Sequence, residues 1–150
     1  MNPPMPTPAF ELVTALRRFH RLLQARLDGA LNGLGLSYAQ YEVLRLLREE
    51  PNLHAGAIGR RLGITRQAAH SLLRQLQQAD LVELLPRDGG IRGAYLTGRS
   101  DRRIRRCVDA VAHATAPLAD LDRGTAQSLL DALDVCERAL TRPPPPWWLE

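Results

Sequence analysis

The sequence predicts a mainly α-helical fold that carries one small β-hairpin. Apolar residues recur every three or four positions through most of the 150 residues, which is the spacing of amphipathic helices. Around residues 81–96 this spacing gives way to two short strand-like segments that flank Asp88-Gly89-Gly90. Such a tripeptide is typical of hairpin turns because its residues tolerate positive φ angles. We therefore expect four helices, a hairpin and two further helices.

The elements follow in order from their start and stop signals. A long helix over residues 9–34 exceeds what a small core needs, so part of it should pack on another subunit. Ser37 and Gln40 have the spacing of a capping box, and Pro51 ends the helix that they begin. The remaining elements are expected as helices at 53–62 and 65–79, strands at 81–85 and 92–96, and helices at 101–116 and 123–141.

Charge is unevenly distributed along the chain. Between Ile58 and Arg106 the sequence has eleven arginines and four acids, whereas the rest has nine arginines and twelve acids. A basic segment on an otherwise acidic molecule favours a polyanionic partner, although a solvated face gives the same count. No apolar run is long enough to span a membrane and no secretory signal is visible, so we expect a cytoplasmic protein without a membrane partner.

The residues that usually support catalysis or metal binding lack the required spacing. Cys107 and Cys136 lie far apart and away from the four histidines. The sequence offers no serine, histidine and acid set and no glycine-rich phosphate loop. We therefore expect no enzyme activity, no metal and no cofactor. Oxidation sensing by either cysteine is the alternative, but cysteines on apolar helix faces are usually inert.

The segment from Ile58 to Leu76 has the features of a helix-turn-helix. Gly59 and Ala69 are small enough for a close helix crossing, and Gly63 can adopt the positive φ of the turn. The alternative is an ordinary amphipathic helical hairpin. The outward side of the second helix favours DNA reading, because it has no acid and carries hydrogen-bonding side chains. These are Thr65, Arg66, Gln67, His70, Ser71 and Arg74.

The hairpin that follows has the composition of a wing. Arg87 and Arg92 flank its turn, and an arginine at a wing tip can enter the minor groove. Asp88 would orient one of these arginines. The alternative is a surface turn with a weak salt bridge. Together with the preceding segment, the hairpin predicts a winged helix-turn-helix.

Four stretches carry a resemblance to the MarR (multiple antibiotic resistance regulator) family of transcriptional regulators: residues 36–44, residues 58–76, Ala79–Val82 and Tyr95–Thr97. The resemblance implies a homodimer that binds pseudo-palindromic DNA operators, commonly as a repressor relieved by a small aromatic or anionic effector or by oxidation. The chain departs from the family pattern at its shorter wing and at Asp80, where the family usually has glycine.

The resemblance also divides the chain into parts. It implies a dimerisation lobe built from 9–34 and 101–141 and a DNA-binding lobe at 36–99, leaving a flexible arm at 1–8 and a Pro/Trp tail at 142–150. His20, Tyr38, Tyr41 and Arg45 are candidates for an effector pocket, with ordinary packing as the alternative. A winged-helix module that binds protein rather than DNA is the competing function.

Overall fold

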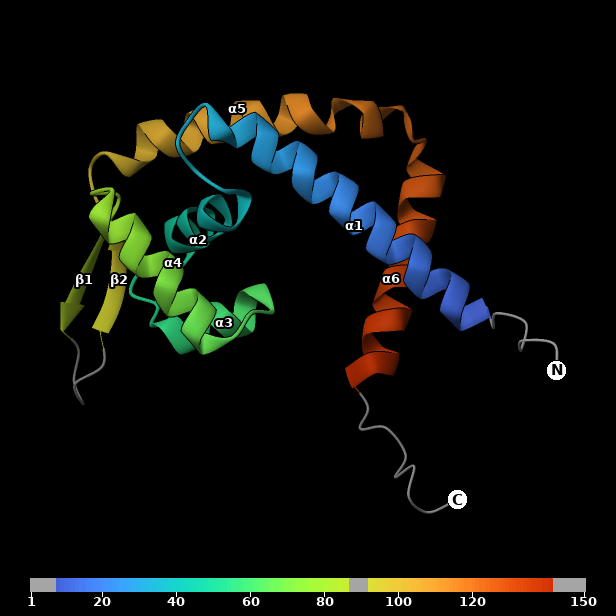
Figure 1. Ribbon diagram of the computed structural model, residues 1–150, viewed down its shortest axis with the longest axis horizontal. Helices are drawn as coiled ribbons and strands as arrows, with labels where there is room; N and C mark the ends of the chain where they lie inside the picture. Colours follow the sequence, from blue (N-terminus) through green and yellow to red (C-terminus); the bar gives the residue numbers. More distant parts are fainter. Residues whose placement is uncertain (1–7, 87–91, 142–150) are drawn as a thin grey trace, which may run out of the picture. The chain divides into compact units, whose positions relative to one another are not determined.

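The computed structural model describes residues 8–86 and 92–141 (Figure 1). The predicted arm therefore lies almost wholly outside the described residues, as do Arg87, Asp88 and the Pro/Trp tail. The elements are α1 (Pro8–Asn32), α2 (Tyr38–Glu49), α3 (Ala55–Leu62), α4 (Arg66–Gln78), β1 (Val82–Pro86), β2 (Arg92–Leu96), α5 (Ser100–Thr115), the 3-10 helix η2 (Ala116–Asp120) and α6 (Arg123–Thr141). The chain divides into two compact units, with the boundary between Ala114 and Thr115.

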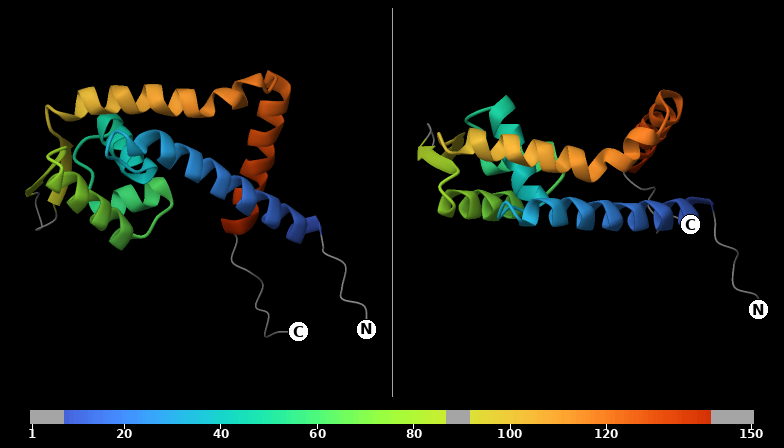
Figure 2. Two further views of the ribbon diagram at one scale, coloured as in Figure 1. Left: turned by 45° about the horizontal axis from the view of Figure 1, so that its top comes forward. Right: turned by 90° about the horizontal axis from the view of Figure 1, so that it is seen from above.

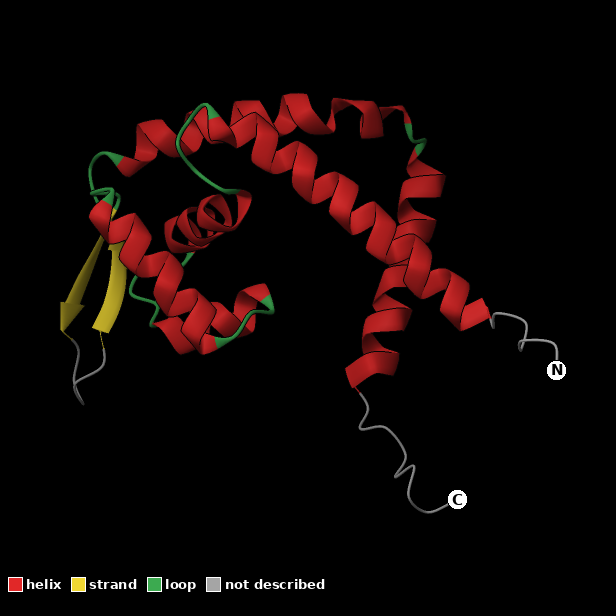
Figure 3. Cartoon of the chain, viewed as in Figure 1, coloured by secondary structure: helices red, strands yellow, loops and turns green. Residues whose placement is uncertain are grey.

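The predicted fold class is confirmed, with helices and one antiparallel two-stranded sheet in the expected order (Figure 3). In that sheet Val82 pairs with Leu96 and Pro86 pairs with Arg92. The expected start of the third helix at Leu53 was wrong. Leu53 instead forms a β-bridge with Ala94, and the Ala94 N–H donates to the Leu53 carbonyl over 2.9 Å, so the helix begins two residues later.

The predicted capping box at the start of α2 is confirmed. Ser37 Oγ accepts from the Gln40 N–H at 3.2 Å, and Gln40 Oε1 accepts from the Ser37 N–H at 2.9 Å. Two further bonds tie this turn to its neighbours. Asp28 of α1 accepts from the Tyr38 N–H at 2.7 Å, and Gln40 Nε2 donates to Gln75 of α4 at 2.8 Å. The first turn of α2 thus joins α1 to α4.

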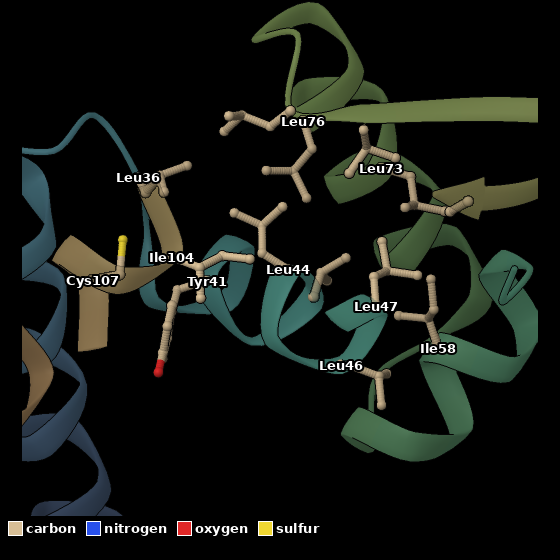
Figure 4. Close-up of a cluster of buried hydrophobic side chains, with 14 of the residues drawn as sticks. Leu36, Tyr41, Leu44, Leu46, Leu47, Ile58, Leu73, Leu76, Ile104 and Cys107 are labelled. Carbon is tan, nitrogen blue, oxygen red and sulfur yellow. The ribbon is translucent and has the colours of Figure 1, made fainter. Parts of the chain in front are cut away.

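The core of the first unit forms around α2, which contacts α1, α3, α4 and β2. Leu44 and Leu47 of α2 are almost completely buried against Ile58 of α3 (Figure 4). Leu73 and Leu76 of α4 and Ile104 of α5 complete the cluster. Burial of side chains of this size stabilises the fold by about 1.5–3 kcal/mol each. The same packing fixes the position of α4.

Two arginines also join α1 to α5. Each donates a hydrogen bond to a carbonyl at or just beyond the C-terminal end of the other helix. Arg26 Nε of α1 donates to the carbonyl of Ala114 in the last turn of α5 over 2.6 Å. Arg103 of α5 donates to the carbonyl of Leu34, just beyond α1. Because these carbonyls lack intrahelical partners, the arginines supply the missing donors. The C-terminal part of α1 therefore runs antiparallel to α5, and Figure 2 shows the two helices from two further directions.

Most of the exposed large apolar side chains among the described residues lie on two helices, α1 and α6. On α1, Phe10, Val13 and Phe19 are each more than half exposed. On α6 no residue is buried, and Leu129 and Leu130 are also more than half exposed. No helix among the described residues has both the length and the apolar character that crossing a membrane requires.

Candidate nucleic-acid interface

The turn between α3 and α4 has the backbone that the sequence predicts. Gly63 is left-handed, with φ 66°, and ends α3. Gly59 lies against the chain as it leaves the turn, where a Cβ would meet the Ile64 carbonyl oxygen at 2.8 Å. Thr65 caps α4, since its hydroxyl accepts from the Ala68 N–H at 3.1 Å. Both glycine predictions are confirmed, and backbone contacts set the angle between the helices.

α4 has two distinct faces. Ala69, Leu73 and Leu76 are buried in the core. The opposite side is what we call the polar face of α4, and all of its side chains are exposed, as the sequence predicts. The polar face consists of Arg66, Gln67, His70, Ser71 and Arg74. No acid lies between Thr65 and Gln78, so the face is positively charged and rich in hydrogen-bond donors.

The polar face borders an open groove between α3, α4 and the hairpin, elements that lie next to one another in Figure 1. None of the described residues that line this recognition groove is acidic. Its polar residues are His54, Arg60, Arg66, Gln67, His70 and Arg92. His54 and Arg60 are not among the DNA-contacting residues that the sequence predicts. Histidine is an uncommon helix cap, and α3 carries two adjacent arginines whose directions the sequence alone does not distinguish.

The hairpin is attached to the rest of the unit at its base. Thr97 Oγ1 donates to the Asp80 carbonyl at 2.8 Å, and the buried Ser100 hydroxyl donates to the Leu81 carbonyl. Asp80 has φ 59° and forms a salt bridge with Arg99 at 3.0 Å. Glycine adopts this left-handed conformation without strain, which explains why the family usually has glycine where this chain has Asp80. Arg92 lines the groove, whereas Arg87 and Asp88 of the predicted wing lie outside the described residues.

The predicted effector residues are only partly brought together. The Tyr38 and Tyr41 rings lie 5.9 Å apart between centroids on α2. Arg45 follows one turn later, where it is exposed and pairs with Glu49 at 2.8 Å. His20 is exposed on α1, and no hydrogen bond or ion pair of the described residues joins it to this group. The pocket stays a prediction.

Partial burial changes the ionisation of the groups around these tyrosines. It raises the pKa of Tyr38 and of Tyr41, and the nearby Arg45 charge partly opposes both shifts. Burial also raises the pKa of the Glu42 carboxyl, again opposed by Arg45. The Arg45 charge thus acts on both tyrosines and on Glu42, while its guanidinium is paired with Glu49.

The two cysteines differ in exposure. Cys107 is completely buried, and burial raises the pKa of its thiol against the opposing charges of Arg103 and Arg106. Cys136 of α6 is partly exposed. A buried thiol of raised pKa has the character of an inert core residue. Among the described residues no cluster of histidines, cysteines and acids has the arrangement of a metal site.

Comparison with known proteins identifies the family. The sequence profile of the MarR family matches residues 34–92. The HTH-type transcriptional repressor Rv2887 of Mycobacterium tuberculosis is 31% identical over 113 residues, which cover 68% of this chain and 81% of the relative. The chain belongs to the MarR family. The resemblance of residues 36–44 and 58–76 is therefore confirmed, and the chain is one of the winged helix-turn-helix transcriptional regulators.

Solved structures agree with this assignment. The Rv2887 structure in complex with DNA has a TM-score of 0.64 and 27% identity, covering 83% of this MarR-family chain and 96% of its own. The Rv2887 complex with p-aminosalicylic acid has a TM-score of 0.65 and 28% identity, with coverages of 84% and 98%. The MarR regulator Sco5413 of Streptomyces coelicolor shares the fold, with a TM-score of 0.80 and 21% identity, covering 89% of this chain and 96% of its own.

Proposed function

We propose that this chain is a transcriptional repressor that binds duplex DNA as a homodimer through α4 and the wing. The observation that carries the proposal is the polar face of α4. It is exposed and free of acids, and it is held at a fixed angle by the buried side of the same helix. The proposal gives the chain a binding role with no reaction to catalyse, and it places the chain in the cytoplasm, where its DNA lies.

The types of side chain on the polar face match groups on DNA. Arg66 and Arg74 can each donate two hydrogen bonds to guanine, and Gln67 can pair with adenine in the same way. His70 and Ser71 supply single donors for bases or phosphates. Arg92 at the edge of the groove would reach the backbone or the minor groove from the hairpin. Arg87 would extend that contact from the wing, and Asp88 would orient one of the two arginines.

The exposed apolar surfaces support assembly of two copies. α1 and α6 each present several large apolar side chains to solvent, and a stable protein rarely leaves such surfaces uncovered. We assign them, with α5, to the dimer interface. Leu130→Glu would place a charge in that interface and shift sedimentation from dimer to monomer. Glu137→Gln on the same helix is the matched control, and an unchanged dimer in the leucine variant would contradict the assignment.

The DNA contact is tested first by selecting bound sequences from a random duplex pool and then by titrating the selected operator. Arg66→Ala or Arg74→Ala should each cost about 1–3 kcal/mol of binding free energy if the arginine reads a base. Arg138→Ala on α6, where Arg138 pairs with Asp134, is the control that should leave binding unchanged. Binding by both α4 variants at wild-type strength would refute the proposal and leave a protein-binding winged helix as the alternative.

A small aromatic acid is the proposed effector class. Rv2887 was crystallised with salicylic acid and with p-aminosalicylic acid. In this chain Tyr38, Tyr41 and Arg45 offer aromatic surface, hydroxyls and a cation for such a ligand, with His20 as a further candidate. Salicylate should weaken operator binding of the wild type, and Arg45→Gln should reduce that effect. Equal responses of wild type and variant would exclude Arg45 from the effector site.

A further inference from the structure

We propose that His54 and Arg60 of α3 form a phosphate-binding pair that holds one strand of the DNA backbone beside the polar face of α4. This inference rests on the proposed function and extends the interface to a second helix. Both residues line the recognition groove, His54 as the N-cap of α3 and Arg60 within that helix, and neither is among the DNA-contacting residues expected from the sequence.

The hydrogen bond that His54 makes fixes which of its ring nitrogens can donate. Nδ1 accepts from the Ala57 N–H at 3.2 Å and so caps α3. A nitrogen that accepts a hydrogen bond cannot carry a proton, so the proton of the neutral ring is on Nε2. Nε2 lies on the other side of the imidazole and has no hydrogen-bond partner among the described residues. The cap therefore leaves a single neutral donor for a ligand in the groove.

Gly56 brings the two side chains of the pair together. A Cβ at Gly56 would lie 3.2 Å from Cε1 and 3.3 Å from Nδ1 of His54, and 3.8 Å from Nη1 of Arg60. The imidazole and the guanidinium thus converge over the same glycine. A neutral N–H beside a guanidinium offers a hydrogen bond and a positive charge to one small anion, which suits a phosphate oxygen.

The two adjacent arginines of α3 have different environments. Arg61 pairs with Glu50 at 2.6 Å and does not line the groove. Arg60 lines the groove and has no acidic partner among the described residues. Its charge is therefore available to a phosphate, whereas that of Arg61 is already neutralised. Because the two residues share a helix and both are exposed, Arg61 is a built-in control for Arg60.

The first experiment separates capping by His54 from DNA binding by His54. Aspartate is a better helix cap than histidine, so His54→Asp should keep or raise the thermal unfolding midpoint. Its carboxylate would repel a phosphate, and affinity for DNA should fall more than about tenfold. His54→Asn keeps the cap through Oδ1 and adds no charge, but its shorter side chain places no N–H where Nε2 lies. The affinity of this variant for DNA should fall by a smaller factor. A His54→Asp variant that folds and binds DNA like the wild type would overturn the proposal.

The second experiment measures the salt dependence of binding. Each phosphate contact contributes about 0.9 to the slope of log K against log salt, and Arg60→Gln removes one contact from each protomer of the dimer. The slope for this variant should therefore be shallower by about 1.8. Arg61→Gln should keep the wild-type slope. Arg60→Gln should reduce the affinity for the selected operator and for random duplex by the same factor, because a phosphate contact carries no sequence information. Equal slopes for the two variants, or a loss confined to the operator, would exclude the phosphate contact.

The two proposals fail in different ways. If the wild type binds DNA and Arg66→Ala weakens it while the His54 and Arg60 variants bind normally, the phosphate-binding pair is wrong and the repressor proposal stands. If the wild type binds neither duplex, the repressor proposal fails and the phosphate pair fails with it.

Discussion

Gly59 of α3 lies so close to the carbonyl oxygen of Ile64 that a Cβ at Gly59 would meet that oxygen at 2.8 Å. The Ile64 N–H also donates to the Gly59 carbonyl at 2.9 Å, so the two backbones are bonded as well as in contact. The atoms nearest to this added Cβ all belong to the backbone of Ile64, Thr65 and Arg66. A side chain at position 59 could therefore be accommodated only by moving the start of α4.

Gly59→Ala should therefore destabilise the fold by about 1–3 kcal/mol, the usual cost of overpacking, and weaken operator binding. Urea unfolding and DNA titration measure the two effects. Gly29→Ala on α1 is the matched control, because nothing lies within 4 Å of its added Cβ. Since alanine is the better helix former, the control should gain about 0.5–1 kcal/mol. A Gly59→Ala protein as stable as the wild type would contradict the close approach.

Asp80 combines a left-handed backbone with an exposed ion pair to Arg99. The free energy of unfolding of Asp80→Gly should lie within about 1 kcal/mol of the wild-type value, because glycine relieves the backbone strain and this offsets the loss of the ion pair. Asp80→Val should be less stable than the glycine variant by about 1–2 kcal/mol, since a branched side chain strains this conformation. Asp80→Asn tolerates the backbone and removes the charge, so it isolates the ion pair. Equal stability of the glycine and valine variants would rule out the backbone explanation.

Glu42 links stability to pH. Burial raises the pKa of its carboxyl, so folding favours the protonated form. The contribution of Glu42 to stability is fully present below the pKa that its carboxyl has in the unfolded chain. It is lost as the pH rises through the higher pKa of this carboxyl in the folded chain. Glu42→Gln cannot ionise, so it should be more stable than the wild type near pH 7. The difference should shrink towards about pH 4. Urea midpoints that differ equally at both pH values would contradict this.

The burial of Cys107 predicts that its thiol reacts slowly with reagents in solution. In a Cys136→Ser chain the remaining thiol should react with an aromatic disulfide reagent at least roughly a hundredfold more slowly when folded than in urea, because reaction requires opening of the core. Loss of operator binding on brief peroxide treatment of this variant would show instead that Cys107 is accessible. The Cys107→Ala chain, with Cys136 intact, is the complementary control.

The sequence was informative where the signals are local. The α6 bounds at Arg123–Thr141, the capping box of Ser37 and Gln40, and the left-handed Gly63 all depend on neighbouring residues, and each is confirmed. The start of α3 depends on the distant Ala94, which pairs with Leu53, and no local pattern reveals that.

The same limit applies to the candidate site. The helical period of α4 separates its buried and exposed faces, so the polar face was predictable. His54 enters the groove through a helix cap that is rare for histidine, and Arg60 differs from Arg61 only in where α3 directs each side chain. Those placements depend on packing between helices. The contacts themselves, at Arg66 or Arg74, stay predictions until DNA is titrated.

The division of α4 into a buried and an exposed face bears on how such a regulator can evolve. Ala69, Leu73 and Leu76 hold the helix in place, while its outward residues take no part in the core. Exposed substitutions usually change stability by less than about 0.5 kcal/mol. Under the proposed function, single mutations there would change which operator is preferred without a folding penalty, and duplicated copies of the gene would acquire new targets while keeping one inherited scaffold.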